Sequence, residues 1–354
     1  TGTLEGIFTK AINQIHIEEV NLLGAQAVAN PASTVGIGER TIYGTPIHDV
    51  DFGWDPVRHS AEFRNVVRLR NTSDNYSYAI SAELQRPFGT VFLARGAYTY
   101  ARAFDTQILT SSIATSNYGY NPIGASIDDR PTTPSDFDRP HKVVLSGMAT
   151  LFPRFGGTEV SLVYVGQSGR HYSYTYNGDI NGDGYQGVGI YGRNNDLVYV
   201  PRDATDPAEI VMATPADAQL LEQLIRLDPC LRESRGRILE RNACQGPWTN
   251  QLDLRLAQQL PSITGLPGNA RLSLDVINFL NLVNRDWGIQ KGPGHNIITL
   301  LDLEGRQGGD PTAPMVFSFD PTTHLDEDGN AGLPHTKFNT SSRWQINLGI
   351  RYSF

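Results

Sequence analysis

The sequence contains no long apolar run. Hydrophobic residues make up 39% of its 354 residues, yet no stretch approaches the ~20 consecutive apolar residues that a membrane-spanning helix requires. The sequence therefore excludes a helical membrane protein. The formal net charge of −8 argues against nucleic acid as a partner, because surfaces that bind nucleic acid are basic.

Recognisable catalytic motifs are also missing. The eight histidines are scattered along the chain, and no two of them have the helical spacing of a metal-binding motif. The sequence has no Gly-x-Ser-x-Gly nucleophile elbow. We therefore expect that the protein is not an enzyme.

Cysteine is rare, with Cys230 and Cys244 the only two. No further ligands stand at zinc-finger spacing, so a metal site is not expected there. In an oxidising compartment the pair could close a loop of ~15 residues as a disulfide, which stabilises by roughly 3 kcal/mol in the chain-entropy model. The alternative is two unpaired thiols in a cytosolic loop.

An initiator methionine and a signal peptide are absent as well. The chain begins at Thr1, and residues 3–9 already form a strand-like run. We therefore expect a fragment that lacks the N-terminal part of its protein.

The clearest pattern that is present is the unbroken alternation of the last twelve residues. Strand side chains point alternately to opposite faces, so one face of this strand is apolar and the other is polar. The apolar face carries Trp344, Ile346, Leu348, Ile350, Tyr352 and Phe354. Aromatic residues at both ends of an apolar face are typical of a transmembrane barrel strand. The ending resembles the C-terminal assembly signal of bacterial outer-membrane proteins, with Trp344, Tyr352 and Phe354 as its residues.

The same alternation recurs in six earlier segments, with charged residues opposite the apolar face. These segments are 76–84, 92–100, 143–151, 160–164, 252–256 and 272–276. An arginine that faces lipid costs ~2–4 kcal/mol at the membrane midplane, whereas one that faces the lumen costs little. A soluble sandwich would also bury one apolar face, so alternation alone does not separate the two folds.

The lengths of the connections between strands distinguish a membrane barrel from a soluble sandwich. Short turns are expected at 86–90, 153–157 and 261–268, and long loops at about 22–62, 104–140, 170–248 and 283–341. Short turns on one rim and long loops on the other describe an outer-membrane barrel. The sequence thus predicts an all-β fold: an antiparallel transmembrane β-barrel in the bacterial outer membrane. Residues 1–354 would form one partial barrel domain of about eight strands.

Several motifs, in this order along the chain, resemble the C-terminal barrel portion of TonB-dependent receptors, especially the Oar-like group. They are Asn71-Thr-Ser-Asp-Asn-Tyr-Ser-Tyr78, Ala97-Tyr-Thr-Tyr-Ala-Arg102, Ser135-Asp-Phe-Asp-Arg-Pro-His141, Asn177-Gly-Asp-Ile-Asn-Gly-Asp-Gly184, Asn195-Asp-Leu-Val-Tyr-Val-Pro-Arg-Asp203, Asp275-Val-Ile-Asn-Phe-Leu-Asn281 and the terminal strand. The resemblance implies a 22-stranded barrel with an N-terminal plug, of which this chain would hold about the last eight strands.

The resemblance also implies a function and partners. The protein would import a nutrient such as an iron chelate, an oligosaccharide or a peptide. Its partners would be outer-membrane lipid, the barrel assembly machinery and a periplasmic energy-coupling protein that acts through the missing N-terminal part. Two alternatives stay open: a surface adhesion barrel that displays its long loops, and a passive porin.

One loop has the spacing of a calcium ligand set. Asp179, Asn181 and Asp183 alternate, with glycine at the sixth position and the Tyr185 carbonyl next, as in the front half of an EF-hand loop. The closing glutamate is replaced by Ile190, and Asp196 could close the site instead. The alternative is an Asx-rich turn whose carboxylates accept hydrogen bonds from local backbone. Calcium is the only cofactor that the sequence suggests.

One segment within the 170–248 loop has helical features. Thr214 is a plausible N-cap with proline at the first helical position, and leucines recur at helical spacing at 220, 221, 224 and 227. The pattern predicts a short surface helix over residues 214–227, beside the cysteine pair.

Overall fold

The architecture is taken from a computed structural model. It describes residues 1–24, 34–47, 54–152, 156–185, 194–260, 268–294, 296–320, 324–325, 329–334 and 336–353. The expected turn at 261–268 therefore lies almost wholly outside the described residues, as do Phe354 and Ile190.

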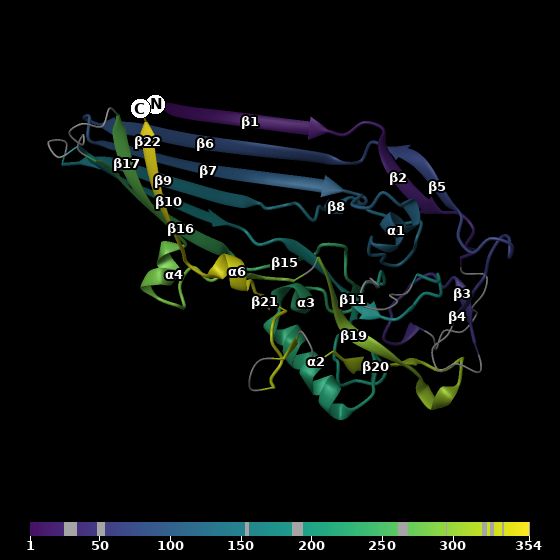
Figure 1. Ribbon diagram of the computed structural model, residues 1–354. Helices are drawn as coiled ribbons and strands as arrows, with labels where there is room; N and C mark the ends of the chain where they lie inside the picture. Colours follow the sequence, from purple (N-terminus) through teal and green to yellow (C-terminus); the bar gives the residue numbers. More distant parts are fainter. Residues whose placement is uncertain are drawn as a thin grey trace.

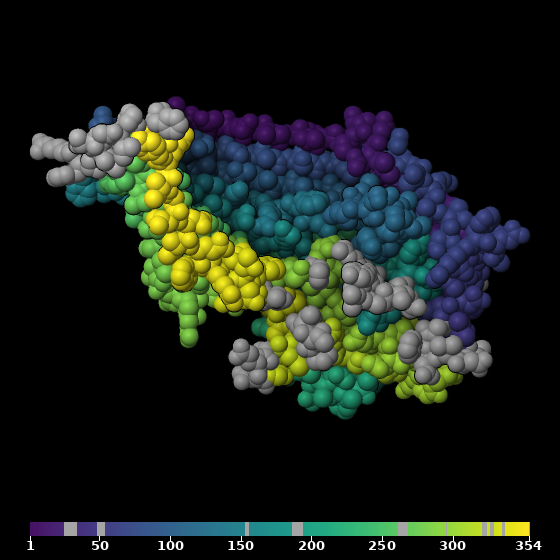
Figure 2. Space-filling model, viewed as in Figure 1, coloured from purple at the N-terminus to yellow at the C-terminus, as the bar shows by residue number. Residues whose placement is uncertain are grey.

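The largest sheet is a wall of antiparallel strands (Figure 1). In order across the sheet these are β1 (Gly2–Lys10), β6 (Tyr76–Phe88), β7 (Phe92–Asp105), β9 (His141–Leu151), β10 (Thr158–Gln167), β16 (Thr249–Gln259), β17 (Asn269–Ile277) and β22 (Gln345–Ser353). A short strand, β8 (Thr133–Pro134), also pairs with β7. Within the described residues β1 and β22 each have one partner strand, so the wall is open at both edges. Figure 2 shows purple β1 and the yellow C-terminal segment along two margins of the face in view.

The register of the pairs aligns the alternating residues of every strand. One row across the sheet runs through Leu84, Gly96, Leu145, Tyr164 and Leu252. Since opposed residues of an antiparallel pair share a face, all the apolar positions of the alternating segments lie on one side of the wall. We call this side the apolar face. Many of its large side chains are solvent-accessible, Ile350 at 75% and Leu348 at 70%.

The other side of the wall is polar. Arg95 pairs with Glu83 at 2.7 Å on neighbouring strands, and Arg271 reaches Glu159 at 2.9 Å across β16. A hydroxyl pair, Ser81 and Thr99, lies 2.9 Å apart in the same layer. These charged pairs lie opposite the apolar face, as the sequence pattern predicts, whereas the register places Lys10, Arg86 and Arg102 on the apolar face itself.

The connections at one rim of the wall are short. Residues 89–91 join β6 to β7, and Gly89 adopts a left-handed φ of +63° that suits glycine in a tight turn. Residues 152–157 separate β9 from β10 in the sequence, and residues 153–155 of the turn expected there lie outside the described residues. The register places the N-terminus of β1 and the C-terminus of β22 at this same rim, where Figure 1 shows both chain ends.

A second, folded layer lies at the opposite rim. Its sheet has the order β13 (Val211–Met212), β20 (Met315–Phe319), β19 (Ile297–Arg306), β11 (His171–Asn177) and β15 (Cys244–Gln245). Four two-stranded pairs accompany it: β2 (Gln14–Glu19) with β5 (Val67–Thr72), β3 (Gly44–Pro46) with β4 (Trp54–Pro56), β12 (Tyr199–Val200) with β14 (Arg237–Ile238), and β18 (Lys291–Gly292) with β21 (Thr336–Lys337). We call this layer the outer domain.

Short helices complete the structure. They are α1 (Ala114–Gly119), α2 (Pro215–Leu227), α3 (Pro229–Glu233), α4 (Phe279–Val283), the 3-10 turn η4 (Gln307–Gly309) and α6 (Asn339–Ser342). In the described part of the chain, no helix is both long and apolar enough to cross a membrane.

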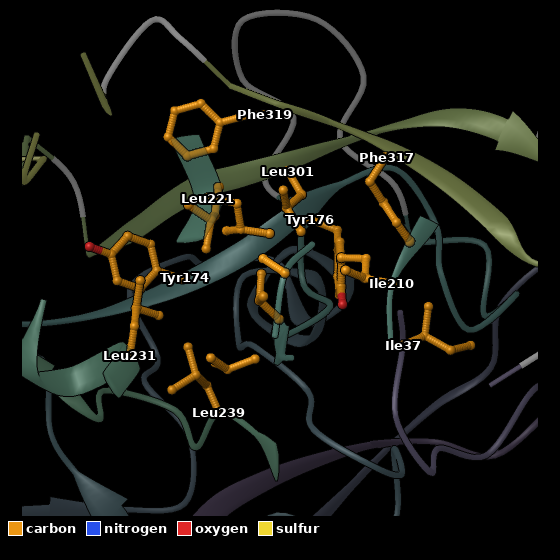
Figure 3. Close-up of a cluster of buried hydrophobic side chains, with 14 of the residues drawn as sticks. Ile37, Tyr174, Tyr176, Ile210, Leu221, Leu231, Leu239, Leu301, Phe317 and Phe319 are labelled. Atoms are coloured by element: carbon orange, nitrogen blue, oxygen red, sulfur yellow. The ribbon is translucent and has the colours of Figure 1, made fainter. Parts of the chain in front are cut away.

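The main hydrophobic core lies in the outer domain and not in the wall. Tyr174 and Tyr176 from β11 pack with Leu301 from β19, Phe317 from β20 and Leu221 from α2 (Figure 3). The segments 170–248 and 283–341 were expected as long loops, yet together they build this sheet. Each supplies only part of the apolar surface, so neither can bury a core alone.

The expected helix corresponds to α2. The Thr214 side chain caps it by accepting a hydrogen bond from the Asp217 amide at 3.1 Å, and Pro215 opens it. Leu221 and Leu224 are buried, as the spacing predicts. Leu227 differs: it is 49% exposed, and Ile225 is buried in the core instead.

The structure joins Cys230 and Cys244 in a disulfide. The bond links α3 to β15 and so ties the helical segment to the sheet. Replacing both cysteines with serine should loosen this segment by roughly 3 kcal/mol, because the unfolded loop regains its freedom. Trypsin should then cleave faster at Arg232 and Arg235 in the folded full-length protein. A Ser234→Ala variant controls for a change in the same loop, and an unchanged cleavage rate in the double-serine variant would contradict the prediction.

Candidate functional site

The first candidate site is a cluster of buried carboxylates that follows β11. Asp179, Asp183 and Asp196 are each at most 3% exposed. Asp196 lies in a separate segment, and a hydrogen bond of 2.9 Å from the Ile180 amide to its carboxylate brings it into the cluster. We call these three residues, with Asn181 and Asn195, the Asp loop.

Local backbone geometry holds the carboxylates of the Asp loop. The Asp179 carboxylate accepts hydrogen bonds from the amides of Gly182 at 2.6 Å and Gly184 at 2.8 Å. Both glycines have left-handed φ angles, +74° and +80°, which explains why glycine is needed at these two positions. The Asp183 carboxylate accepts from the Tyr185 amide at 2.8 Å and from the Asn195 side-chain amide at 3.1 Å.

A single arginine offsets the negative charge of the cluster. Arg40 and Asp196 form a fully buried ion pair at 3.2 Å. Burial, reinforced by the Asp196 carboxylate, raises the pKa of Asp179 to about 7. Burial also raises the pKa of Asp183, with Asp179 and Asp196 adding to the effect. The pKa of Asp196 is raised by burial too, although Arg40 opposes the shift.

The five residues expected around calcium are therefore close together, but the side-chain oxygens of Asp179, Asn181, Asp183 and Asp196 already accept hydrogen bonds. Tyr185 uses its amide on Asp183 and donates its hydroxyl to Glu19 at 3.0 Å. In the part of the chain that the structure describes, no group of three or more acidic, histidine or cysteine side chains is arranged to hold a metal ion. The geometry is that of an Asx-rich turn. The Asn195 side-chain oxygen, buried without a hydrogen-bond partner, and the excess negative charge keep calcium as a hypothesis to be tested.

Two cavities in the outer domain form the second candidate site, which sequence reasoning missed. The larger holds about 520 Å³, and its charged and aromatic lining comprises Glu39, Tyr199, Arg202, Glu209 and Arg237. The smaller holds about 280 Å³ and is lined by residues that include Asp129, Arg130, Glu240 and Arg241. Both are lined by Ala125 and Ile238. Their residues come from segments near 39, 125, 200 and 238, and no motif in the sequence connects these segments.

Charge pairs shape the larger cavity. Arg202 forms an ion pair with Glu209 at 2.8 Å, and the Tyr199 hydroxyl donates to the same carboxylate at 2.7 Å. These bonds lower the pKa of Glu209, with the Tyr199 hydroxyl as the largest cause. The carboxylate is therefore ionised, and the cavity presents both signs of charge to a ligand.

The C-terminal assembly signal that the sequence predicts consists of Trp344, Tyr352 and Phe354. Trp344 directly precedes β22 and is 45% exposed. Tyr352 is opposite Ala270 of β17 on the apolar face. Phe354 lies outside the described residues. The structure places the two described aromatics near opposite ends of the terminal strand.

A comparison with known families identifies the class of the protein. Residues 9–289 match the sequence model of the family described as outer membrane beta barrel domain. The match covers well over half of the chain, and it includes every strand of the wall except β22 and all but the last two residues of β1. The chain therefore belongs to this family, and its location is the bacterial outer membrane. A search of curated proteins and a search of solved structures each gave no match.

Membership of the family assigns the two faces of the wall: the apolar face lies against lipid. Leu348→Arg should therefore destabilise the folded full-length barrel by about 2–4 kcal/mol, the cost of an arginine near the membrane midplane. The neighbouring Asn347→Arg puts the same side chain on the polar face and should cost far less. Denaturant titration of both variants in lipid bilayers measures the difference. Equal losses of stability would contradict the assignment of the faces.

The Asp loop predicts a pH dependence for the outer domain. Because folding raises the pKa of Asp179 to about 7, well above its ordinary value of 3.8, the folded protein holds this carboxyl group in its protonated form. Its contribution is greatest below pH 4 and is lost as pH rises toward 7. In the presence of a calcium chelator, the protection of this loop against hydrogen exchange should fall as the pH rises from 5 to 8. Asp183→Asn should reduce that fall.

If calcium binds, it should restore protection at pH 8 in the native protein and not in Asp183→Asn. Calorimetric titration of the full-length barrel with calcium chloride provides the direct measurement. A matched Asp217→Asn variant, altered at an exposed helix end, controls for loss of a carboxylate elsewhere. Identical heats in the native protein and in Asp183→Asn would reject the calcium site.

Proposed function

We propose that the protein is an outer-membrane receptor of the TonB-dependent type that imports a nutrient through a plugged barrel. The observation that carries this proposal is the larger cavity of the outer domain. At about 520 Å³ it falls in the size range of small-ligand sites, which runs from about 300 to 1,000 Å³. It lies at the rim opposite the short turns, which is the extracellular side of an outer-membrane barrel.

The open edges of the wall support the same proposal. In lipid, an unpaired strand edge leaves backbone donors and acceptors without partners, at several kcal/mol for each group. β1 and β22 therefore need further strands beside them, as the wall of a larger barrel would provide. The plug and the segment that meets the periplasmic coupling protein would lie outside these 354 residues.

The cavity lining favours a polar ligand. Arg202, Arg237, Glu39 and Glu209 bring both signs of charge to one cavity, and the Tyr199 ring adds a flat apolar surface. Such a lining suits a ligand that carries both charges, and a short peptide has this chemistry. Iron chelates and oligosaccharides are the other nutrient classes to be tested. Lipid and the barrel assembly machinery are the partners that any member of this class requires.

The test compares uptake by cells that carry the full-length protein, with and without the energy-coupling protein. Labelled peptides, iron chelates and oligosaccharides serve as probes. We expect one class to enter only when both proteins are present. Arg237→Gln should lower that uptake about tenfold, since it removes a cavity cation. Arg226→Gln on the exposed side of α2 is the matched control.

Two outcomes would contradict import by this mechanism. Uptake that persists without the coupling protein would indicate a passive porin. Ligand or surface binding without any coupled uptake would indicate an adhesion barrel that displays the outer domain. Barrel abundance in each variant, measured by the heat-dependent shift in gel mobility, ensures that lost uptake is not lost assembly.

A further inference from the structure

We propose that the apolar face of the wall carries a binding groove for one phospholipid of the periplasmic leaflet. Its acyl chain would lie in a hollow across β6, β7, β9, β10 and β16, and its phosphate would meet Arg86. The inference rests on the membrane location of the family and on the geometry of the wall. It is independent of the proposed import.

The hollow is large and almost wholly apolar. Its volume is about 780 Å³, and Leu84, Phe88, Phe92, Leu145, Leu162 and Leu252 are among the large side chains that line it. Small residues lie between them on the central strands: Ala94, Gly96, Gly147 and Ala149. The register places all of these on the apolar face, in adjoining rows. A face of alternating large side chains is thus interrupted by a depression with a floor of small residues.

The hollow lies in the periplasmic half of the membrane. Along β6 it extends from Leu84 to Phe88, the last residue before the short turn. At about 3.3 Å per residue, four residues span ~13 Å. This is about half of the ~25 Å apolar band of an outer-membrane barrel. The hollow therefore has the depth of one leaflet, and short turns mark the periplasmic side.

A single cation, Arg86, lines the hollow midway along its β6 side, two residues before Phe88 at the end next to the short turn. Within the described strands of the wall, Arg86 is the only charged side chain on the apolar face in the half next to the short turns. Arg95 also lines the hollow, but its side chain pairs with Glu83 on the polar face. Arg86 has no carboxylate partner among the described residues, and its guanidinium lies 5.2 Å from the Phe88 ring centre.

Charge complementarity selects the occupant. Basic residues at the membrane surface attract anionic headgroups, and guanidinium groups match the geometry of phosphate oxygens. An acyl chain would fill the hollow and contact its apolar lining. A phospholipid offers both parts at the spacing of one leaflet. The chemistry therefore points to a bound phospholipid with an anionic phosphate at Arg86.

The experiment uses the full-length protein purified in mild detergent and titrated with dioleoyl phosphatidylglycerol, with retention followed by native mass spectrometry. The native protein should retain one lipid preferentially. Ala149→Leu fills the floor of the hollow and should weaken retention about tenfold. Ala82→Leu places the same side chain on the same face outside the hollow and should leave retention unchanged. Ala94→Leu, on the neighbouring strand, serves if Ala149→Leu does not assemble.

Arg86→Gln tests the headgroup contact. It should weaken retention of phosphatidylglycerol several-fold and leave retention of dioleoylglycerol, which has no phosphate, unchanged. Equal retention in Ala149→Leu and Ala82→Leu would overturn the groove. Equal retention of phosphatidylglycerol in the native protein and in Arg86→Gln would overturn the phosphate contact. Preferential binding of lipid A would overturn the assignment to the periplasmic leaflet.

Discussion

The wall depends on one constraint, which is that every strand must keep its register with its neighbours. A shift of one residue in any pair would move all the apolar side chains of that strand to the polar face. The row from Leu84 to Leu252 shows that the register is kept without a break across five strands. In lipid the backbone must also be paired within the sheet. Register and pairing together therefore decide both the exposed chemistry and the stability of the wall.

The outer domain has the reverse arrangement of apolar and polar residues, because its surface is exposed to water. Its apolar residues are collected in a closed core, and its charged residues line the cavities. The two parts meet at Asp138, which is 1% exposed. This carboxylate binds Arg102 of β7 at 2.9 Å and His171 of β11 at 3.1 Å, and it accepts from the Ala103 amide at 2.7 Å. One buried carboxylate thus fixes the start of the outer sheet to the end of a membrane strand.

Sequence reasoning succeeded where structure is local. Alternation predicted the strands of the wall, and the Thr214-Pro215 pair located the start of α2. It failed for the outer sheet, because β11 pairs in parallel with β19, more than a hundred residues away. Tyr172, Tyr174 and Tyr176 do alternate with hydroxyl residues. However, β11 is buried on both faces except at its last residue, so the polar half of the pattern does not mark a solvent-exposed side. The alternation of tyrosines was the signal that could have revealed this strand.

The Asp loop also depends on a contact between distant segments that the sequence does not predict, and the same contact reaches the larger cavity. The sequence predicted which carboxylates would cluster, but not that Arg40 would reach them from a separate segment. Besides its ion pair with Asp196, Arg40 donates hydrogen bonds to the carbonyls of Ile37 at 2.9 Å and Leu197 at 2.7 Å. Gly38 and Glu39 line one side of the cavity, and Tyr199 lines another. The hydrogen bonds of Arg40 connect the two segments that contain these residues. A buried charge is strongly destabilising when its partner is lost. The arginine that offsets the Asp loop therefore also holds two walls of the cavity in place.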